Sequence, residues 1–445
     1  MKKGFIEGSL DRVFKLKKNN TTIGREILAG TTIFIAMSYI LFVNPSVLGA
    51  AGMDQGAIFA ATALAAIIGC VATAFLANYP IAIAPSLGSN AFFAYTVVVG
   101  MKIPWQTALA GVFVASLLFL LVTVFKVREK IINNIPADLK SAIAAGIGLF
   151  VAFVGLQNGG LVQKDKSTLL TITDFHNPTV WLTVFGLVLT LILVARKVPG
   201  NMLIGMAATS ILGILTGLIK MPKAIVAPIP SIKPTFAQAL FHVKDVFTPQ
   251  MLTVVIIFFL VAFFDTTGTV VGLLEQAGLM KRGEKVSPRV GKVLLSDAIS
   301  MTGSSIFGSS PTSAYVESST GIAVGGRTGL TSLTVAVFFA ASLFFSPLLS
   351  VVTSQVTAPI MIIVGSYMVT SLGNIDWNKF ESAFPAFVTI AGMPLFYDIS
   401  YGFAFGVMSY VIIMVVKGKA KKVHPIMYLA FLIFLFLLFA LNLAH

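Results

Sequence analysis

The stretch Ala84-Pro85-Ser86-Leu87-Gly88-Ser89-Asn90-Ala91-Phe92-Phe93 interrupts an apolar region in the first half of the chain. The stretch Gly308-Ser309-Ser310-Pro311-Thr312-Ser313-Ala314-Tyr315-Val316-Glu317-Ser318 does the same in the second half. Lipid cannot hydrogen-bond to a broken helix, so non-helical backbone at membrane depth occurs only where protein or a polar cavity covers it. A matched pair of breaks, one in each half, is typical of the central site of a secondary transporter. The pattern therefore predicts a membrane carrier.

The composition excludes a water-soluble globular domain. Of 445 residues, 57% are hydrophobic and 11% are charged, and the mean hydropathy is +0.93. Apolar runs of about 17 to 22 residues recur from Leu28 to Leu443, close to the length that crosses a hydrocarbon core. The basic segment 1-26 has no apolar core or cleavage site of a secretory signal, so we expect it to remain on the chain in the cytoplasm.

Charge, cysteine and histidine content argue against other functional classes. The net charge of +14 comes from basic residues in loops beside apolar runs, which indicates positive-inside topology rather than nucleic-acid binding. Cys70 is the only cysteine and lies in an apolar run, where we expect it to serve packing. The four histidines lie in loops or at the end of the chain, so the sequence predicts no metal site and no Ser-His pair, hence no enzyme.

The expected fold is an all-α polytopic membrane protein of about 14 transmembrane segments arranged as 7+7 inverted repeats, with broken segments at positions 3 and 10. An odd number of spans in each half inverts the second half. The two break prolines, Pro85 and Pro311, are 226 positions apart, which matches the offset between the first spans of the two halves. In each break we expect a short extended run, Ile81–Ala84 or Ser305–Gly308, before the proline, which then starts a half-helix. Basic loops around Lys126, Arg196, Lys281 and Arg327 all fall inside in this count. Two alternatives remain open for the C-terminal end: residues 425-443 form a further span, or residues 383-417 form two short segments that do not fully cross the membrane.

Acidic residues inside apolar spans are the main candidates for chemistry, because a charge at membrane depth is costly and usually functional. They are Asp265, Asp297, Glu317 and Asp398. Glu317 follows Pro311 by six positions and Asn90 follows Pro85 by five, so both are expected on the first turns of half-helices. The alternative for all three is a structural role. Glu317 and Asn90 would then cap their half-helices, and Asp265 would be hydrogen-bonded by its neighbouring threonines. For Asp297 and Asp398 we favour a cap or an interfacial charge.

These residues resemble the AzgA-like branch of nucleobase:cation symporter family 2, the hypoxanthine, guanine and adenine permeases, over nearly the whole chain. The matching stretches are Arg25 and Gly30 ahead of Thr31-Thr32, Phe34, Ala36-Met37-Ser38-Tyr39-Ile40, Val43-Asn44-Pro45, Ala84-Pro85, Gly88, Asn90-Ala91-Phe92-Phe93-Ala94-Tyr95-Thr96-Val97, Ile103-Pro104-Trp105-Gln106-Thr107-Ala108, Ile135-Pro136-Ala137-Asp138-Leu139-Lys140, Phe264-Asp265-Thr266-Thr267-Gly268-Thr269, and Tyr315-Val316-Glu317-Ser318 leading into Gly325-Gly326-Arg327-Thr328-Gly329-Leu330-Thr331. The chain departs from the resembled pattern at Ser86, Leu87 and Ser89, which stand for Gly, Met and Leu. Ala262 stands for an Asp.

The resemblance implies a core domain and a gate domain with the substrate between the half-helices. The implied organisation is a cytoplasmic N-terminus at 1-26, core segments 27-126 and 251-348, gate segments 127-220 and 349-418, an extracellular loop 221-250, and a C-terminal basic turn with an apolar segment at 419-445. It also implies that Asn90, Glu317 and Asp265 form the site.

We therefore expect a plasma-membrane carrier that imports guanine or hypoxanthine, with adenine as a further candidate, by proton symport. The expected substrate-binding residues are Asn90, Glu317, Asp265, Thr266, Thr269, Phe92, Ser89 and Thr312. Asp265 and Glu317 are the expected proton-coupling residues. No cofactor other than the coupling proton is expected; the partners are a nucleobase and the lipid bilayer, without nucleic acid, and a homodimer stays an open alternative. Alternatives are the same fold carrying uracil, xanthine or a small anion, and a channel.

Overall fold

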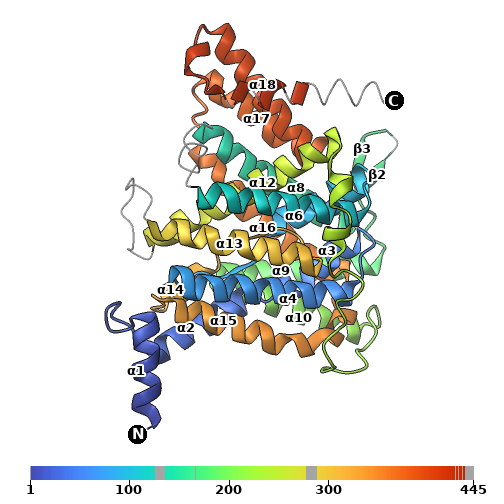
Figure 1. Cartoon of the computed structure of the whole chain (residues 1–445). Helices are drawn as coiled ribbons and strands as arrows, with labels where there is room; N and C mark the ends of the chain where they lie inside the picture. Colours follow the sequence, from blue (N-terminus) through green and yellow to red (C-terminus); the bar gives the residue numbers. More distant parts are fainter. Residues whose placement is uncertain are drawn as a thin grey trace.

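The computed structural model describes residues 2–125, 136–165, 167–276 and 288–435, apart from 426, 429 and 433. Most helices of this part lie side by side in one bundle (Figure 1). Nine helical segments in it are long and apolar enough to cross a membrane. They are Ile23–Gly49, Gln55–Ala77, Trp105–Val124, Ala137–Asn158, Pro178–Ala195, Pro249–Thr267, Gly329–Val351, Ser354–Asn374 and Ile399–Val416. Three shorter apolar helices are Leu87–Gly100, Asn201–Leu215 and Phe380–Leu395.

The long helices pack in two groups. The first helix group consists of α2 (Ile23–Met37), α3 (Ile40–Gly49), α4 (Gln55–Ala72), α6 (Trp105–Val124), α12 (Pro249–Gln276), α13 (Pro288–Phe307) and α15 (Gly329–Ser342). The second helix group consists of α8 (Ala137–Asn158), α9 (Pro178–Ala195), α10 (Asn201–Leu215), α16 (Ser354–Val369), α17 (Phe380–Leu395) and α18 (Ile399–Val416). Within the second group α8 and α16 approach closely because Gly148 and Gly365 face each other: a Cβ added to Gly148 would lie 2.6 Å from the carbonyl oxygen of Gly365.

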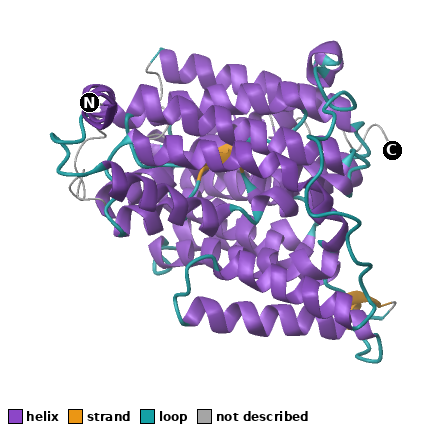
Figure 2. Cartoon of the chain, turned by 90° about the horizontal axis from the view of Figure 1, so that it is seen from below, coloured by secondary structure: helices purple, strands orange, loops and turns teal. Residues whose placement is uncertain are grey.

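Short elements connect and interrupt these helices. They are α1 (Lys2–Phe14), η1 (Thr73–Ala77), β1 (Ile83–Pro85), α5 (Leu87–Ala91), the π-helical η2 (Phe92–Gly100), β2 (Val162–Asp165), β3 (Leu169–Ile172), α11 (Gln238–Phe241), η3 (Val243–Val246), β4 (Thr312–Ala314), α14 (Ser318–Ala323), η4 (Leu343–Val351), η5 (Thr370–Asn374) and η6 (Ala420–Lys422). Strands β2 and β3 form an antiparallel hairpin at one end of the bundle, which Figure 2 draws in orange.

The two sequence breaks meet inside the bundle, where Figure 2 shows a second short pair of orange strands. Strands β1 and β4 are antiparallel, with Ala84 opposite Ser313. The pairing extends past the strands, since the amide of Ser86 donates to the carbonyl of Pro311 at 2.9 Å and the amide of Tyr315 donates to the carbonyl of Ala82 at 3.0 Å. Each break therefore supplies the hydrogen bonds that the other lacks, which is how non-helical backbone persists at this depth.

The local form of the second break differs from the expectation. We expected Ser305–Gly308 to be extended, but α13 continues to Phe307 and the strand follows Pro311. The end of α13 is stabilised from outside the helix, because Thr235 Oγ1 donates to the carbonyl of Phe307 at 2.9 Å. Gly308, with φ of +93°, then turns the chain.

The expectation that each break proline starts a half-helix is also wrong. Pro85 is the last residue of β1, and α5 begins two positions later at Leu87. Pro311 precedes β4, and α14 begins only at Ser318. Proline has no backbone N–H to donate, so it is tolerated at these positions outside the helices.

Some expectations lie outside the described residues. These are the basic loop residues Lys126, Arg128, Lys130, Lys281, Arg282 and Lys285, residue 135 of the resemblance, and the last ten residues of the segment 419-445.

Candidate substrate site

The first candidate acid, Asp265, lies on α12 beside the first break. Ser86, just after β1, donates its hydroxyl to Asp265 Oδ2 at 2.9 Å. The hydroxyl of Ser313 on β4 is a second hydrogen-bonding neighbour of this carboxylate. One carboxylate thus receives a donor from each break. Ser86, a position where the chain departs from the resembled pattern, takes a direct part in the site.

A second acid, Asp297, lies near the middle of α13 and is fully buried. Its Oδ2 accepts from Thr266 Oγ1 at 2.5 Å, and its Oδ1 accepts from Thr312 Oγ1 at 2.7 Å. Thr266 in turn accepts from the amide of Ala314 at 3.3 Å. Two expected substrate-binding residues, Thr266 and Thr312, therefore bind the Asp297 carboxylate in this structure.

The position of Asp297 differs from the expectation. We expected a cap or an interfacial charge there, but Asp297 lies near the middle of α13 and caps no helix end in the described part of the chain. A fully buried carboxylate needs several donors, and Thr266 and Thr312 supply them here. Asp398, by contrast, fits the expected cap: its Oδ1 accepts from the amide of Ser400 at 2.6 Å at the start of α18.

The third acid, Glu317, stands at the start of α14, but its carboxylate does not cap that helix. Instead the hydroxyl of Tyr39, between α2 and α3, donates to Glu317 Oε1 at 2.8 Å. The preceding Val316 is 62% exposed although it lies at the break, and Glu317 is itself partly exposed. The second break is therefore open on one side, with a carboxylate oriented by a tyrosine at its edge.

A buried amide, Asn44 on α3, links the two breaks. Asn44 Nδ2 donates to Thr62 Oγ1 and to Ser309 Oγ, each at 2.8 Å. Asn44 Oδ1 accepts from Asn90 Nδ2 at 3.0 Å and from Ser310 Oγ at 3.2 Å. All four hydrogen-bonding positions of this amide are used, so its orientation is determined by its partners.

The direction of these bonds fixes which atom of Asn90 is free. Thr62 Oγ1 donates to the carbonyl of Ile58 at 2.7 Å, so it must accept from Asn44. The Oδ1 of Asn44 therefore faces Asn90, which has to present its Nδ2 there. Asn90 Oδ1 is left as a buried acceptor without a partner among the described residues, and Ser89 Oγ beside it is also unpaired. The first break thus offers an acceptor to a ligand N–H.

The two remaining expected residues differ in position. Phe92 is fully buried, with its ring edge-to-face against Phe258 of α12 at 4.9 Å between centroids, so it packs α5 and η2 onto α12 and presents no open ring face. Thr269 is partly exposed and lies one helical turn beyond Asp265 on α12.

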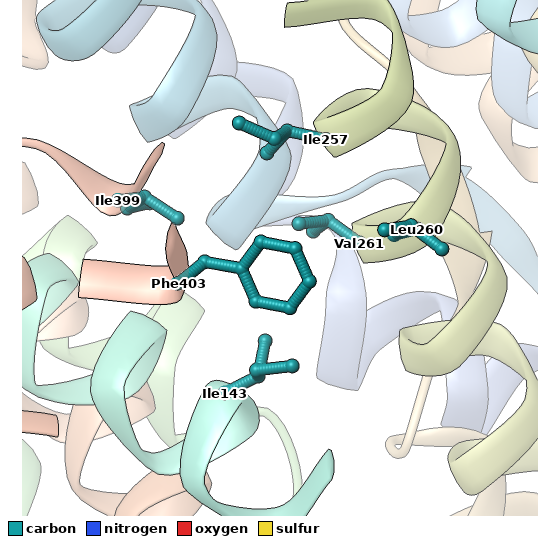
Figure 3. Close-up of a pocket in the computed structure, with 6 residues that line it drawn as sticks. All are labelled: Ile143, Ile257, Leu260, Val261, Ile399 and Phe403. Carbon is teal, nitrogen blue, oxygen red and sulfur yellow. The ribbon is translucent and has the colours of Figure 1, made fainter. Parts of the chain in front are cut away.

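The boundary between the two helix groups beside this site is apolar. Figure 3 shows six side chains from α12, α8 and α18 pointing toward one another around a small cavity. They are Ile143, Ile257, Leu260, Val261, Ile399 and Phe403. Polar contacts between described residues also cross the boundary. Asn158 Nδ2 donates to the Tyr95 hydroxyl at 2.6 Å, the hydroxyls of Ser46 and Thr357 lie 3.3 Å apart, and Ser210 Oγ donates to the carbonyl of Val351 at 3.1 Å.

Paired helix breaks inside an apolar bundle, with carboxylates gathered around them, define a polytopic membrane transporter rather than an enzyme. Residues 24–405 match the model of the Permease family, Xan_ur_permease. The chain belongs to this family, nucleobase:cation symporter family 2.

Individual relatives agree with this assignment. The chain is 49% identical to the guanine/hypoxanthine permease PbuG of Bacillus subtilis over 431 residues, covering 95% of this chain and 98% of that protein. It is 38% identical to the adenine permease AdeQ of Escherichia coli, covering 94% and 93%. Among solved structures, the transmembrane domain of the cyanobacterial bicarbonate transporter BicA is similar in fold, with a TM-score of 0.63 at 18% identity, covering 85% of this chain and 97% of that one.

Proposed function

We propose that this protein imports purine nucleobases, guanine or hypoxanthine first and adenine as a further candidate, by proton symport across the cell membrane. The observation that carries the proposal is the set of acceptors at the two breaks: the carboxylates of Asp265 and Glu317 and the free Oδ1 of Asn90. A purine base presents adjacent N–H donors on a flat edge, and a carboxylate accepts two such donors. The permeases named for guanine, hypoxanthine and adenine among the relatives support the same cargo.

The chemistry of the site favours a base over a small anion, although the similar fold of BicA carries bicarbonate by its name. In the described part of the chain, Asp265, Asp297 and Glu317 are hydrogen-bonded by hydroxyl groups, and none of them forms a salt bridge with Lys or Arg there. An anion placed among these carboxylates would be repelled. Uracil and xanthine also carry N–H donors, so they are the nearest competing substrates.

Proton coupling is assigned to the carboxylates. Asp265 and Glu317 can each bind and release a proton, and Asp297 lies close enough to Asp265 for the two charges to interact. We assign substrate binding mainly to Glu317 and proton transfer mainly to Asp265. Thr266 and Thr312 act through Asp297, whose carboxylate they orient.

The proposed architecture is 7+7 inverted repeats with a cytoplasmic N-terminus. The antiparallel pairing of β1 with β4 supports an inverted relation between the halves. We equate the first helix group, which holds both breaks, with the core domain (27-126 and 251-348) and the second group with the gate domain (127-220 and 349-418). Movement of the core against the apolar boundary of Figure 3 would then expose the site to either side.

The direct test is uptake of labelled guanine, hypoxanthine, adenine, xanthine and uracil by cells that lack their own permeases. We expect uptake of at least one purine base, competed by the unlabelled base and abolished by a protonophore. If the protein reaches the membrane and none of the bases enters, the proposal fails. Uptake that does not saturate with concentration would instead indicate a channel.

A further inference from the structure

The N-terminal helix α1 runs across the ends of the bundle rather than along it. In Figure 1 it stands upright beside helices that lie horizontally, and in Figure 2 the same helix is seen end-on. Its first residues extend past the outer helices in Figure 1. When the long helices cross a membrane, a helix with this direction lies in the plane of the membrane surface, with its N-terminal end over lipid.

The other end of α1 is fixed to the first helix group. Phe14 and Leu16 are 2% and 4% exposed and pack with Ala74 of η1 and Leu330 of α15. Asn78 strengthens the contact, because its Nδ2 donates to the carbonyl of Phe14 at 2.9 Å and its Oδ1 accepts from the start of α15. The helix is therefore held at a defined height relative to the bundle.

The outer surface of this segment is strongly basic. Residues 1–25 contain seven Lys or Arg and two acidic residues, Glu7 and Asp11. The basic side chains that the structure describes as exposed are Arg12, Lys15, Lys17, Lys18 and Arg25. Asp11 is already engaged, since its Oδ1 accepts from the amide of Lys17 at 2.8 Å. The exposed apolar side chains of Val13 (51%) and Phe75 (57%) flank this basic surface.

We propose that α1 and the turn 15–20 form a binding surface for anionic lipid headgroups. The basic side chains reach the headgroup phosphates, while the exposed apolar side chains of Val13 and Phe75 enter the acyl boundary beside them. Each Lys or Arg near an anionic bilayer surface contributes about fivefold in binding. Positive-inside topology explains why these residues are inside, but it acts during insertion and requires no contact in the folded protein.

The test is amide hydrogen exchange of the full-length protein in vesicles of phosphatidylcholine with or without phosphatidylglycerol. We expect exchange in residues 3–14 to slow by about fivefold or more when phosphatidylglycerol is present, and to return toward the phosphatidylcholine value at high salt. The hairpin β2–β3 serves as an internal reference whose exchange should not change. Equal exchange in the two lipids, or protection that depends on protein concentration because a second copy covers α1, would overturn the proposal.

A charge variant and its matched control complete the experiment. Replacing Arg12, Lys15, Lys17 and Lys18 together by Gln should remove the phosphatidylglycerol effect, whereas Arg12→Lys with the three lysines changed to Arg should keep it. If the Gln variant does not insert, the salt and lipid comparisons on the native chain still decide. Loss of the effect in the charge-preserving variant would also overturn the proposal. None of these readouts depends on the transported substrate.

Discussion

The sharpest prediction concerns the pair formed by Tyr39 and Glu317. The Tyr39 hydroxyl donates to Glu317 Oε1 at 2.8 Å, and in the described part of the chain no other side chain donates to this carboxylate, so Oε2 can accept from a ligand N–H. In Glu317→Gln the single amide oxygen is held by Tyr39, so an NH2 group faces the donor edge of the base. A hydrogen bond to a charged group contributes roughly 1.5 to 3 kcal/mol, so we expect base binding to weaken by about tenfold to more than a hundredfold.

Tyr39→Phe should have a smaller effect on the same quantity. It leaves the carboxylate intact and removes only the group that orients it, so a loss of about twofold to tenfold is expected from a hydrogen bond of roughly 0.5 to 1.5 kcal/mol. The double variant should lose less than the product of the two single losses, because the residues act as one unit. Tyr410→Phe, which removes a phenolic hydroxyl from α18 in the second helix group, is the matched control and should bind normally.

The assay is equilibrium binding of labelled guanine and hypoxanthine to purified protein, together with the membrane level of each variant. Normal binding by Glu317→Gln would refute the assignment of Glu317 to the substrate. If the Glu317→Gln chain fails to reach the membrane while Tyr39→Phe behaves normally, the carboxylate has a structural role instead.

Four further changes test other parts of the site. Asp265→Asn should retain most of the base binding but abolish proton-driven accumulation, leaving downhill exchange; full accumulation would contradict the coupling role. Thr266→Val should lower stability by about 1 to 3 kcal/mol, because it leaves the buried acid on α13 without one donor; an unchanged melting temperature would contradict this. Ala262→Asp should reduce the folded yield, because Ala262 is fully buried; a normal yield with an altered substrate range would contradict it. Gly88→Ala should slow transport more than binding, because the new Cβ would lie 2.7 Å from Ile147 Cγ2 on α8; an unchanged transport rate would contradict it.

The sequence was sufficient to predict the two breaks and the acids around them. Hydropathy marks apolar runs, and polar residues inside such runs stand out, so Asp265 and Glu317 could be named from the sequence. The pairing of β1 with β4 could not, because three-residue strands carry no periodicity of their own. For the same reason the extended segment of the second break was expected before Pro311, although it follows that residue.

Residue roles within the site depended on contacts between distant segments. Tyr39 and Glu317 are 278 positions apart, and Asn44 and Ser310 are 266 apart, so no local pattern links them. Phe92 was expected to bind substrate by stacking on the base, but in this structure its ring packs on Phe258. Local spacing predicts which residues share a break, whereas the direction of each side chain depends on the tertiary fold.

The most direct test of the central claim is accumulation of labelled guanine or hypoxanthine by the purified protein in sealed vesicles with an imposed proton gradient. We predict saturable accumulation above the external concentration, lost on adding a protonophore, unaffected by replacing sodium with potassium, and absent in Asp265→Asn. Accumulation that requires sodium would contradict proton coupling. Vesicles that hold the folded protein but take up no purine base would contradict the account as a whole.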